Sequence, residues 1–151
     1  LTYRKLLGEV CRFANALKTL GVQKGDRISI YMPMILESVI AMLACTRIGA
    51  IHSIVFAGFS ADSLAERIAS CKGKILLTAD GAWRGEKFLN LKQICDKALE
   101  KCNSLGHSVQ NCIVVSHLSR VTQPRADQNI QKVTMIEDRD LWWHDVVENE
   151  P

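Results

Sequence analysis

The chain has 151 residues, 48% of them hydrophobic and 23% charged, a composition typical of a globular domain rather than of a disordered or fibrous protein. Lys and Arg outnumber Asp and Glu by only 19 to 16, and the excess is scattered, which excludes the basic stripe of a nucleic-acid-binding protein and the cationic patch of a membrane-surface protein. No apolar run reaches the roughly 18 residues that a membrane-spanning helix requires.

Helical and strand patterns alternate along the chain. In the helical segments apolar residues recur at three- and four-residue steps, and capping residues such as Thr2, Ser60 and Asn90 precede them. We expect helices over residues 3–17, 35–48, 61–71 and 91–102, and strands over residues 27–32, 51–56, 74–79 and 111–116. Three of the strands are almost wholly apolar, so the alternation predicts an α/β fold with a mostly parallel sheet flanked by helices on both faces.

The last third of the chain changes in character. We expect residues 1–116 to form the core, residues 117–138 to form a polar surface loop, and residues 139–151 to form a helical segment. The acidic residues Glu137, Asp138 and Asp140 are expected on a solvated face or at a helix N-terminus rather than in a metal site.

The cysteines and histidines predict neither a metal site nor a catalytic group. The six cysteines contain no CxxC pair, and the four histidines show no HExxH context. Five of the cysteines lie within apolar patterns, where a free thiol serves as a small hydrophobe, so we interpret them as reduced core residues of an intracellular protein.

Two segments that follow strands carry residues suited to binding. Ligands of open α/β sheets bind beyond the carboxyl ends of the strands. Phe56 offers an aromatic face there, and nearby Gly58 allows a close approach to the backbone. After the next strand, Arg84 and Lys87 flank Gly85, and their guanidinium and ammonium groups suit a phosphate. Together they indicate a site for a nucleotide with an exposed phosphate.

A structural interpretation of the same residues is open as well. An arginine and a lysine on a loop are more often solvated surface residues than ligand contacts, so Arg84 and Lys87 also suit an ordinary surface. Phe56 at a strand end suits the core, and Trp83 suits packing within the loop. The glycine-rich loop GxxxxGK[ST] is absent, so the sequence offers no recognisable means of gripping the triphosphate of ATP.

Several longer motifs carry a family resemblance. They are TYRKL at residues 2–6, KGDR at 24–27, IYMPM at 30–34, AMLACTRIGA at 41–50, HSIVFAGFS at 52–60, RGEK at 84–87 and DLWWH at 140–144. With these motifs the chain closely resembles the acetyl-coenzyme A synthetase family, the acetate-type branch of the adenylate-forming superfamily of acyl-CoA synthetases and luciferases.

The resemblance implies an acetate–CoA ligase. In this family acetate attacks the α-phosphate of Mg-ATP to give acetyl-adenylate and diphosphate, and the thiol of coenzyme A then releases acetyl-CoA and AMP. An aromatic residue stacks on the adenine of coenzyme A, and a cationic loop meets its phosphates. The resemblance transfers this binding role to Phe56, Gly58, Arg84, Gly85, Glu86 and Lys87, with lysine at 87 where many members have arginine.

The resemblance also implies an incomplete enzyme. The family's Ser/Thr/Gly-rich adenylation loop, acetate pocket and catalytic lysine are absent, so we expect residues 1–151 to be part of an N-terminal AMP-binding domain, inactive alone and without catalytic or metal-ligating residues. ATP and Mg²⁺ would bind to other parts of the same polypeptide, which with acetate and coenzyme A are the expected partners. The combination of motifs looks most like the eukaryotic cytosolic form, and this resemblance implies a cytoplasmic protein, with a nuclear or mitochondrial pool left open.

Two alternatives are left open. A ligase for propionate or another short acid would share these residues, because the acyl pocket lies outside the chain. A truncated, non-catalytic α/β module for nucleotide binding or interaction would also share them. Residues that continue after Pro151 into the adenylation loop would favour the ligase.

Overall fold

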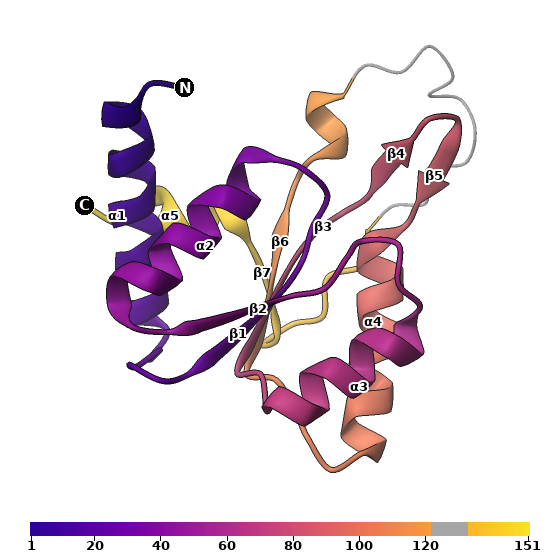
Figure 1. The fold of residues 1–151 in the computed structure, drawn as a ribbon. Helices are drawn as coiled ribbons and strands as arrows, with labels where there is room; N and C mark the ends of the chain where they lie inside the picture. Colours follow the sequence, from indigo (N-terminus) through magenta and orange to yellow (C-terminus); the bar gives the residue numbers. More distant parts are fainter. Residues whose placement is uncertain (122–132) are drawn as a thin grey trace.

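Five strands form one sheet in the order β2-β1-β3-β6-β7, and every neighbouring pair is parallel (Figure 1). The strands are β1 (Arg27–Tyr31), β2 (Ile51–Ile54), β3 (Ile75–Ala79), β6 (Asn111–Val115) and β7 (Asp140–Trp142). This computed structural model describes residues 1–121 and 133–151. The expectation of a mostly parallel sheet is confirmed.

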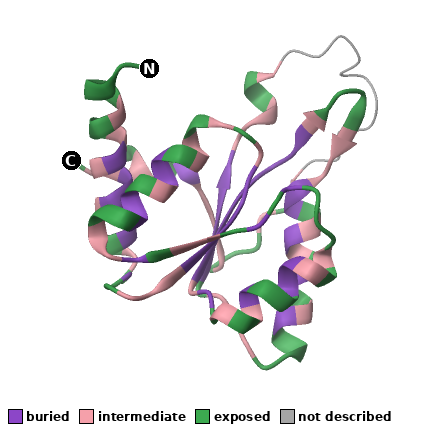
Figure 2. Ribbon diagram, in the orientation of Figure 1, coloured by how far each residue is buried: buried purple, intermediate pink, exposed green. Residues whose placement is uncertain are grey.

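Helices cover both faces of the sheet (Figure 1). On one face lie α1 (Tyr3–Thr19), α2 (Leu36–Ile48) and α5 (Trp143–Glu148), and on the other lie α3 (Ala61–Cys71) and α4 (Leu91–Ser104). The inner strands β3 and β6 are buried at every residue, whereas the edge strand β2 is partly exposed (Figure 2). No helix of the described residues is both long enough and apolar enough to cross a membrane.

The helix starts follow from local chemistry. The side chains of Thr2, Ser60 and Asn90 accept hydrogen bonds from backbone amides three residues ahead, at the first turns of α1, α3 and α4. Gly49 ends α2 in a left-handed conformation with φ of 75°, which costs glycine little because it has no Cβ. The capping residues expected from the sequence therefore act as caps.

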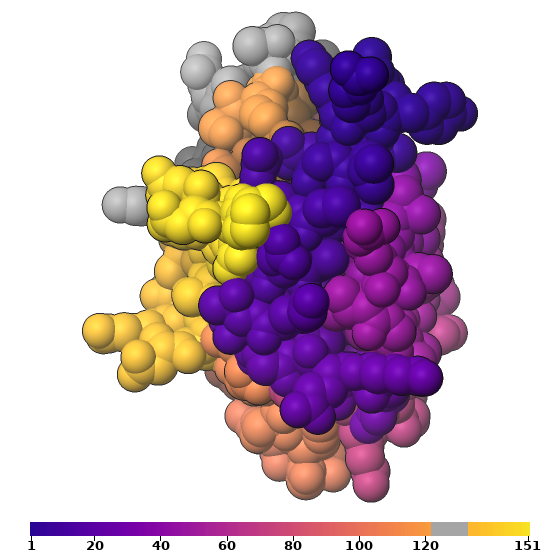
Figure 3. Space-filling view, turned by 90° about the vertical axis from the view of Figure 1, so that its left-hand side faces the viewer, coloured from indigo at the N-terminus to yellow at the C-terminus, as the bar shows by residue number. Residues whose placement is uncertain are grey.

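The C-terminal residues close against the first helix. The Phe13 ring on α1 stacks on Trp143 of α5 with centroids 3.8 Å apart, and Thr19 donates a hydrogen bond of 2.8 Å to the carboxylate of Glu150. Figure 3 shows α1 beside these C-terminal residues on one surface of the molecule.

Two segments differ from the sequence prediction. A β-hairpin of β4 (Ala82–Arg84) and β5 (Lys87–Leu89) replaces the loop expected after β3, and it turns at Gly85, whose φ is 60°. The expected C-terminal helical segment begins as strand β7, which pairs with β6, and becomes helical only at Trp143. Both errors concern three-residue strands, which are too short to show a sequence period.

The polar segment and the acidic residues that follow it also differ from the sequence prediction. Of the surface loop expected over residues 117–138, residues 118–120 form a short 3₁₀ helix, and residues 122–132 lie outside the described residues. The expectation of a solvated acidic face is wrong for Asp140, whose buried carboxylate pairs with the Lys92 ammonium at 2.8 Å and with the Arg139 guanidinium at 2.6 Å. Lys92 comes from α4, which the sequence pattern does not connect to Asp140.

Candidate functional site

A tight turn after β2 presents two aromatic rings to solvent. The Phe59 amide donates to the Phe56 carbonyl at 3.0 Å, and the Tyr31 hydroxyl at the end of β1 donates to the Phe59 carbonyl at 2.7 Å. Burial raises the pKa of Tyr31 to about 12, so this hydroxyl keeps its proton and its role as a donor. With its backbone anchored, the turn leaves Phe56 59% and Phe59 36% exposed.

The two rings lie between two arginines. The Phe56 and Phe59 centroids are 6.2 Å apart in an edge-to-face arrangement. The Arg84 Cζ lies 4.7 Å from the centroid of Phe56, and the Arg67 Cζ, on α3, lies 5.0 Å from the centroid of Phe59. We call this set, Arg67–Phe59–Phe56–Arg84, the arginine–phenylalanine row.

Gly58 makes room for one end of this row. A Cβ at position 58 would lie 2.8 Å from Cε1 of Phe56, closer than Cβ atoms approach other groups in proteins, and 3.0 Å from Nη1 of Arg84, which is a tight contact. Because glycine has no Cβ, the Arg84 guanidinium can lie over the Phe56 ring. Gly58 thus serves the close approach that the sequence suggested.

The hairpin places a second cation beside Arg84. Arg84 on β4 and Lys87 on β5 are register partners, and all four residues 84–87 are exposed, including Gly85 and Glu86 at the turn. Trp83 and Phe88 pack together behind them with centroids 5.2 Å apart. Within the described ranges, Arg67, Arg84 and Lys87 form no ion pair, so their charges face solvent.

The structure thus groups the residues selected from the sequence. Phe56, Gly58 and Arg84 meet directly, whereas Lys87 lies across the hairpin from Arg84. The exposure of Phe56 removes the alternative that it belongs to the core, and Trp83 does pack within the hairpin.

Sequence reasoning missed two members of the row. Phe59 follows Phe56 by three residues in the same turn, and this repeated aromatic was the available signal. Arg67 lies on the exposed side of α3, where a cation normally signals only solvent, so nothing in the sequence distinguished it.

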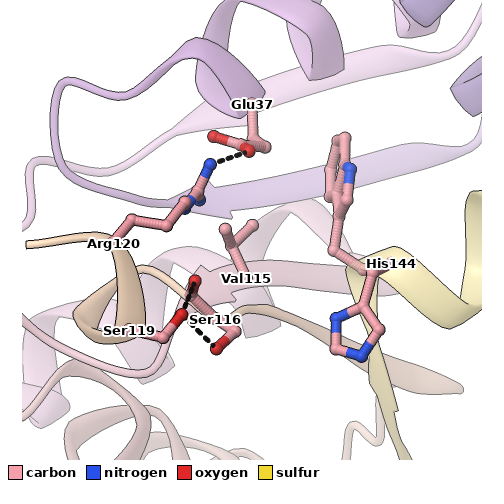
Figure 4. A pocket seen from close by; sticks show the side chains of 7 residues that line it. Glu37, Val115, Ser116, Ser119, Arg120 and His144 are labelled. Carbon is pink, nitrogen blue, oxygen red and sulfur yellow. Dashed lines mark hydrogen bonds and ion pairs between the residues drawn. The ribbon is translucent and has the colours of Figure 1, made fainter.

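A separate pocket of about 350 Å³ opens beyond the carboxyl ends of the strands (Figure 4). Its lining residues are Glu37, Val115, Ser116, Ser119, Arg120, Trp143 and His144. The Glu37 carboxylate pairs with the Arg120 guanidinium at 2.7 Å, and the Ser116 and Ser119 hydroxyls lie 3.1 Å apart. None of the residues selected from the sequence lines this pocket.

The described part of the chain holds no catalytic constellation. Burial raises the pKa of the Cys45 and Cys95 thiols to about 12, so both stay protonated and act as hydrophobes rather than as nucleophiles. Residues 1–121 and 133–151 contain no group of three or more His, Cys, Asp or Glu side chains placed to hold a metal ion. What the arrangement offers is binding: two exposed rings and three cations that form no ion pair with another described residue.

Comparison with known proteins places the chain in a family. The family model described as "AMP-binding enzyme" matches residues 1–147. "Acetyl-coenzyme A synthetase" from Drosophila melanogaster is 67% identical over 149 residues, which are 99% of this chain and 22% of that protein. "Acetyl-coenzyme A synthetase, chloroplastic/glyoxysomal" from Arabidopsis thaliana is 49% identical over 152 residues, all of this chain and 19% of that protein.

A solved structure shows the same fold. "Acetoacetyl-CoA Synthetase from Streptomyces lividans" superposes with a TM-score of 0.78 at 24% identity, over 99% of this chain and 20% of that one. The chain therefore spans about one fifth of the length of the relatives that it matches. The resemblance read from the motifs is confirmed, and the chain belongs to the AMP-binding enzyme family.

Proposed function

We propose that this chain is the part of an acetate–CoA ligase that binds the nucleotide end of coenzyme A. The complete enzyme would convert acetate, ATP and coenzyme A into acetyl-CoA, AMP and diphosphate. The similarity to proteins named acetyl-coenzyme A synthetase supports the reaction. The observation that carries the binding role is the Arg84 guanidinium held over the Phe56 ring, with Lys87 opposite on the hairpin.

The chemistry of the row fits this ligand. Aromatic faces stack on an adenine without a hydrogen-bond code, and a guanidinium adds a cation–π contribution. Arg84 supplies the planar fork that matches phosphate oxygens, and Lys87 adds a point charge. Arg84, Gly85, Glu86 and Lys87 would follow the diphosphate, while Phe56 and Gly58 would frame the base.

We assign the remaining chemistry to the rest of the polypeptide. ATP, Mg²⁺ and acetate would bind there, because the described residues offer neither a metal-holding cluster nor an activated nucleophile. The exposed apolar surface of α1 and α2 supports the proposal that this remainder packs on it. Tyr3 is 92% and Leu7 54% exposed on α1, and Leu43 is 43% exposed on α2.

That packing has a direct test. Hydroxyl-radical footprinting of a polypeptide extended to the length of the relatives should protect Tyr3 and Leu7, relative to the 151-residue chain. Equal labelling of both residues in the two samples would overturn the packing proposal.

We further propose cytoplasmic residence, supported by six free cysteines, and fractionation of cells that express the tagged chain checks it.

Titration of the isotopically labelled chain with coenzyme A tests the binding role. Amide shifts recorded by NMR up to about 10 mM ligand detect binding as weak as about 2.7 kcal/mol. We expect saturable shifts in residues 56–59 and 84–87, and weaker binding by Arg84→Gln. Arg47→Gln, an exposed arginine at the end of α2, serves as the matched control and should bind as the parent chain does. No shift at either segment would refute the proposal.

A further inference from the structure

We propose that a groove at the start of α2 is the seat of another segment of the same polypeptide, and that this segment donates a hydrogen bond to the carboxylate of Glu37. The inference rests on the proposal that the rest of the polypeptide packs on α1 and α2, and it names the place and the contact. It does not involve the residues assigned to coenzyme A. The groove, called the α2 groove below, is a pocket of about 430 Å³ whose lining includes Met34, Leu36, Glu37, Val39, His117 and Arg120.

Helix α2 is apolar on both of its sides. All but four of its 13 residues are apolar. One side, which includes Ile40 and Ala44, is buried in the core, whereas the other side exposes Leu36, Val39 and Leu43. These three residues follow one another at the three- and four-residue steps of a single helix face. A helix that is apolar all round is normally buried all round, so α2 needs a partner that the described residues do not supply.

The carboxylate of Glu37 has one paired and one free oxygen. Its Oε1 accepts a hydrogen bond of 2.7 Å from the Arg120 guanidinium (Figure 4). Its Oε2 is buried, and no group of the described residues donates a hydrogen bond to it. Most buried polar atoms have a partner, and an unsatisfied one destabilises the state in which it occurs. Glu37 therefore favours the binding of a group that brings an N–H or an O–H.

A polypeptide segment matches both features of the α2 groove. Apolar side chains of the segment would cover Met34, Leu36 and Val39, and a backbone N–H would supply the donor for Glu37. The relatives contain such additional polypeptide, because this chain spans only about one fifth of their length. The Arg120 side chain is 48% exposed and is free to move aside as the donor enters.

Oxidation of Met34 by hydrogen peroxide reports whether the α2 groove is covered. Met34 is fully exposed, whereas Met32 is only 8% exposed and serves as the internal control. Mass spectrometry measures both oxidation rates in the 151-residue chain and in a polypeptide extended to the length of the relatives. We expect Met34 to oxidise about tenfold more slowly in the extended polypeptide, because peroxide then reaches it only when the groove opens. Met32 should oxidise slowly in both.

Two substitutions of Glu37 test the hydrogen bond in the extended polypeptide. Glu37→Leu removes both acceptor oxygens and should raise the oxidation rate of Met34 about tenfold, as expected for the loss of one hydrogen bond to a charged group. Glu37→Gln removes the charge that pairs with Arg120 but keeps a carbonyl acceptor, so it should retain most of the protection. Glu100→Leu, on the exposed side of α4 across the sheet, is the matched control and should leave the rate unchanged.

Several results would overturn the inference. They are an equal Met34 rate in the two polypeptides, no effect of Glu37→Leu, and an effect of Glu37→Gln as large as that of Glu37→Leu. A Met34 rate that falls as the concentration of the 151-residue chain rises would assign the groove to a second copy instead. Protection of Tyr3 and Leu7 without protection of Met34 would leave the packing on α1 standing, and no outcome here bears on coenzyme A binding.

Leu36→Ala keeps the test decisive if Glu37→Leu fails to fold, which rapid oxidation of Met32 would reveal. Leu36 is exposed, so its truncation leaves the core of the 151-residue chain intact. We expect Leu36→Ala to raise the Met34 rate severalfold in the extended polypeptide and to leave it unchanged in the 151-residue chain. An unchanged rate in both would show that no segment lies on this side of α2.

Discussion

Gly58→Ala separates the binding site from the fold. The new Cβ would lie 2.8 Å from the Phe56 ring and 3.0 Å from the Arg84 guanidinium, so one of these two side chains must move. Both contacts are with the outer atoms of exposed side chains, which move without disturbing the core. The backbone at Gly58 is not in the left-handed region, so alanine brings no backbone strain there.

The substitution changes the free energy of unfolding through two effects of opposite sign. Gly→Ala at a compatible position stabilises by about 0.4–1 kcal/mol through the unfolded chain, and losing an exposed cation–π contact costs about 0.5–1 kcal/mol. Unfolding by urea should therefore shift by less than about 1 kcal/mol. Coenzyme A should bind roughly three- to tenfold more weakly, because the Arg84 guanidinium is no longer held over the Phe56 ring.

The two readouts are measured on the same sample by circular dichroism and NMR titration. Gly8→Ala is the matched control, since a Cβ there meets nothing within 4 Å and α1 lies away from the row. Unchanged coenzyme affinity in Gly58→Ala would refute the role of the Arg84–Phe56 contact. Loss of the folded state would refute the claim that this contact is separable from the core.

Further predictions concern the ion cluster and the activity. Asp140→Asn should destabilise the chain by roughly 1.5–3 kcal/mol, because the buried Lys92 ammonium and the Arg139 guanidinium then share the carboxylate of Asp96. Asp62→Asn, which breaks the exposed Asp62–Lys101 pair, should cost under about 1 kcal/mol. Urea unfolding measures both, and equal effects would contradict the burial argument. Burial opposes ionisation of Asp140, but hydrogen bonds from Arg139 and Ile136 hold its pKa below the ordinary 3.8. The contribution of Asp140 to the free energy of unfolding is therefore complete above pH 3.8 and is lost as the pH falls through the lower folded-state pKa. Stability measured from pH 7 to 2 should show this loss, and Asp140→Asn should remove this part of the pH dependence. With acetate and Mg-ATP the isolated chain should form no acetyl-adenylate in a diphosphate-release assay, and product would overturn our assignment of that step to the rest of the polypeptide.

The elements that the sequence predicted are those with local causes. Thr2 and Ser60 cap helices through amides three residues away, and Gly49 ends α2 through its own φ, so each signal lies within one turn. Phe56 and Arg84 were selected because parallel strands put their carboxyl ends at one edge, a rule that needs only the order of elements.

The missed features depend on distant partners. Asp140 is buried because Lys92 reaches it from α4, and no pattern around residue 140 reveals that neighbour. Strand β7 forms by hydrogen-bonded pairing with β6, and its three residues are too few to show an alternating hydrophobic pattern in the sequence. Arg67 belongs to the site only because the turn at Phe59 folds beneath it.

Detecting a contact between the adenine ring of coenzyme A and Phe56 tests the proposed binding role most directly. Intermolecular NOEs recorded on the chain saturated with coenzyme A should connect the adenine H2 and H8 protons to the ring protons of Phe56. Adenine NOEs confined to other residues, such as those lining the pocket at Glu37 and Ser116, would contradict it.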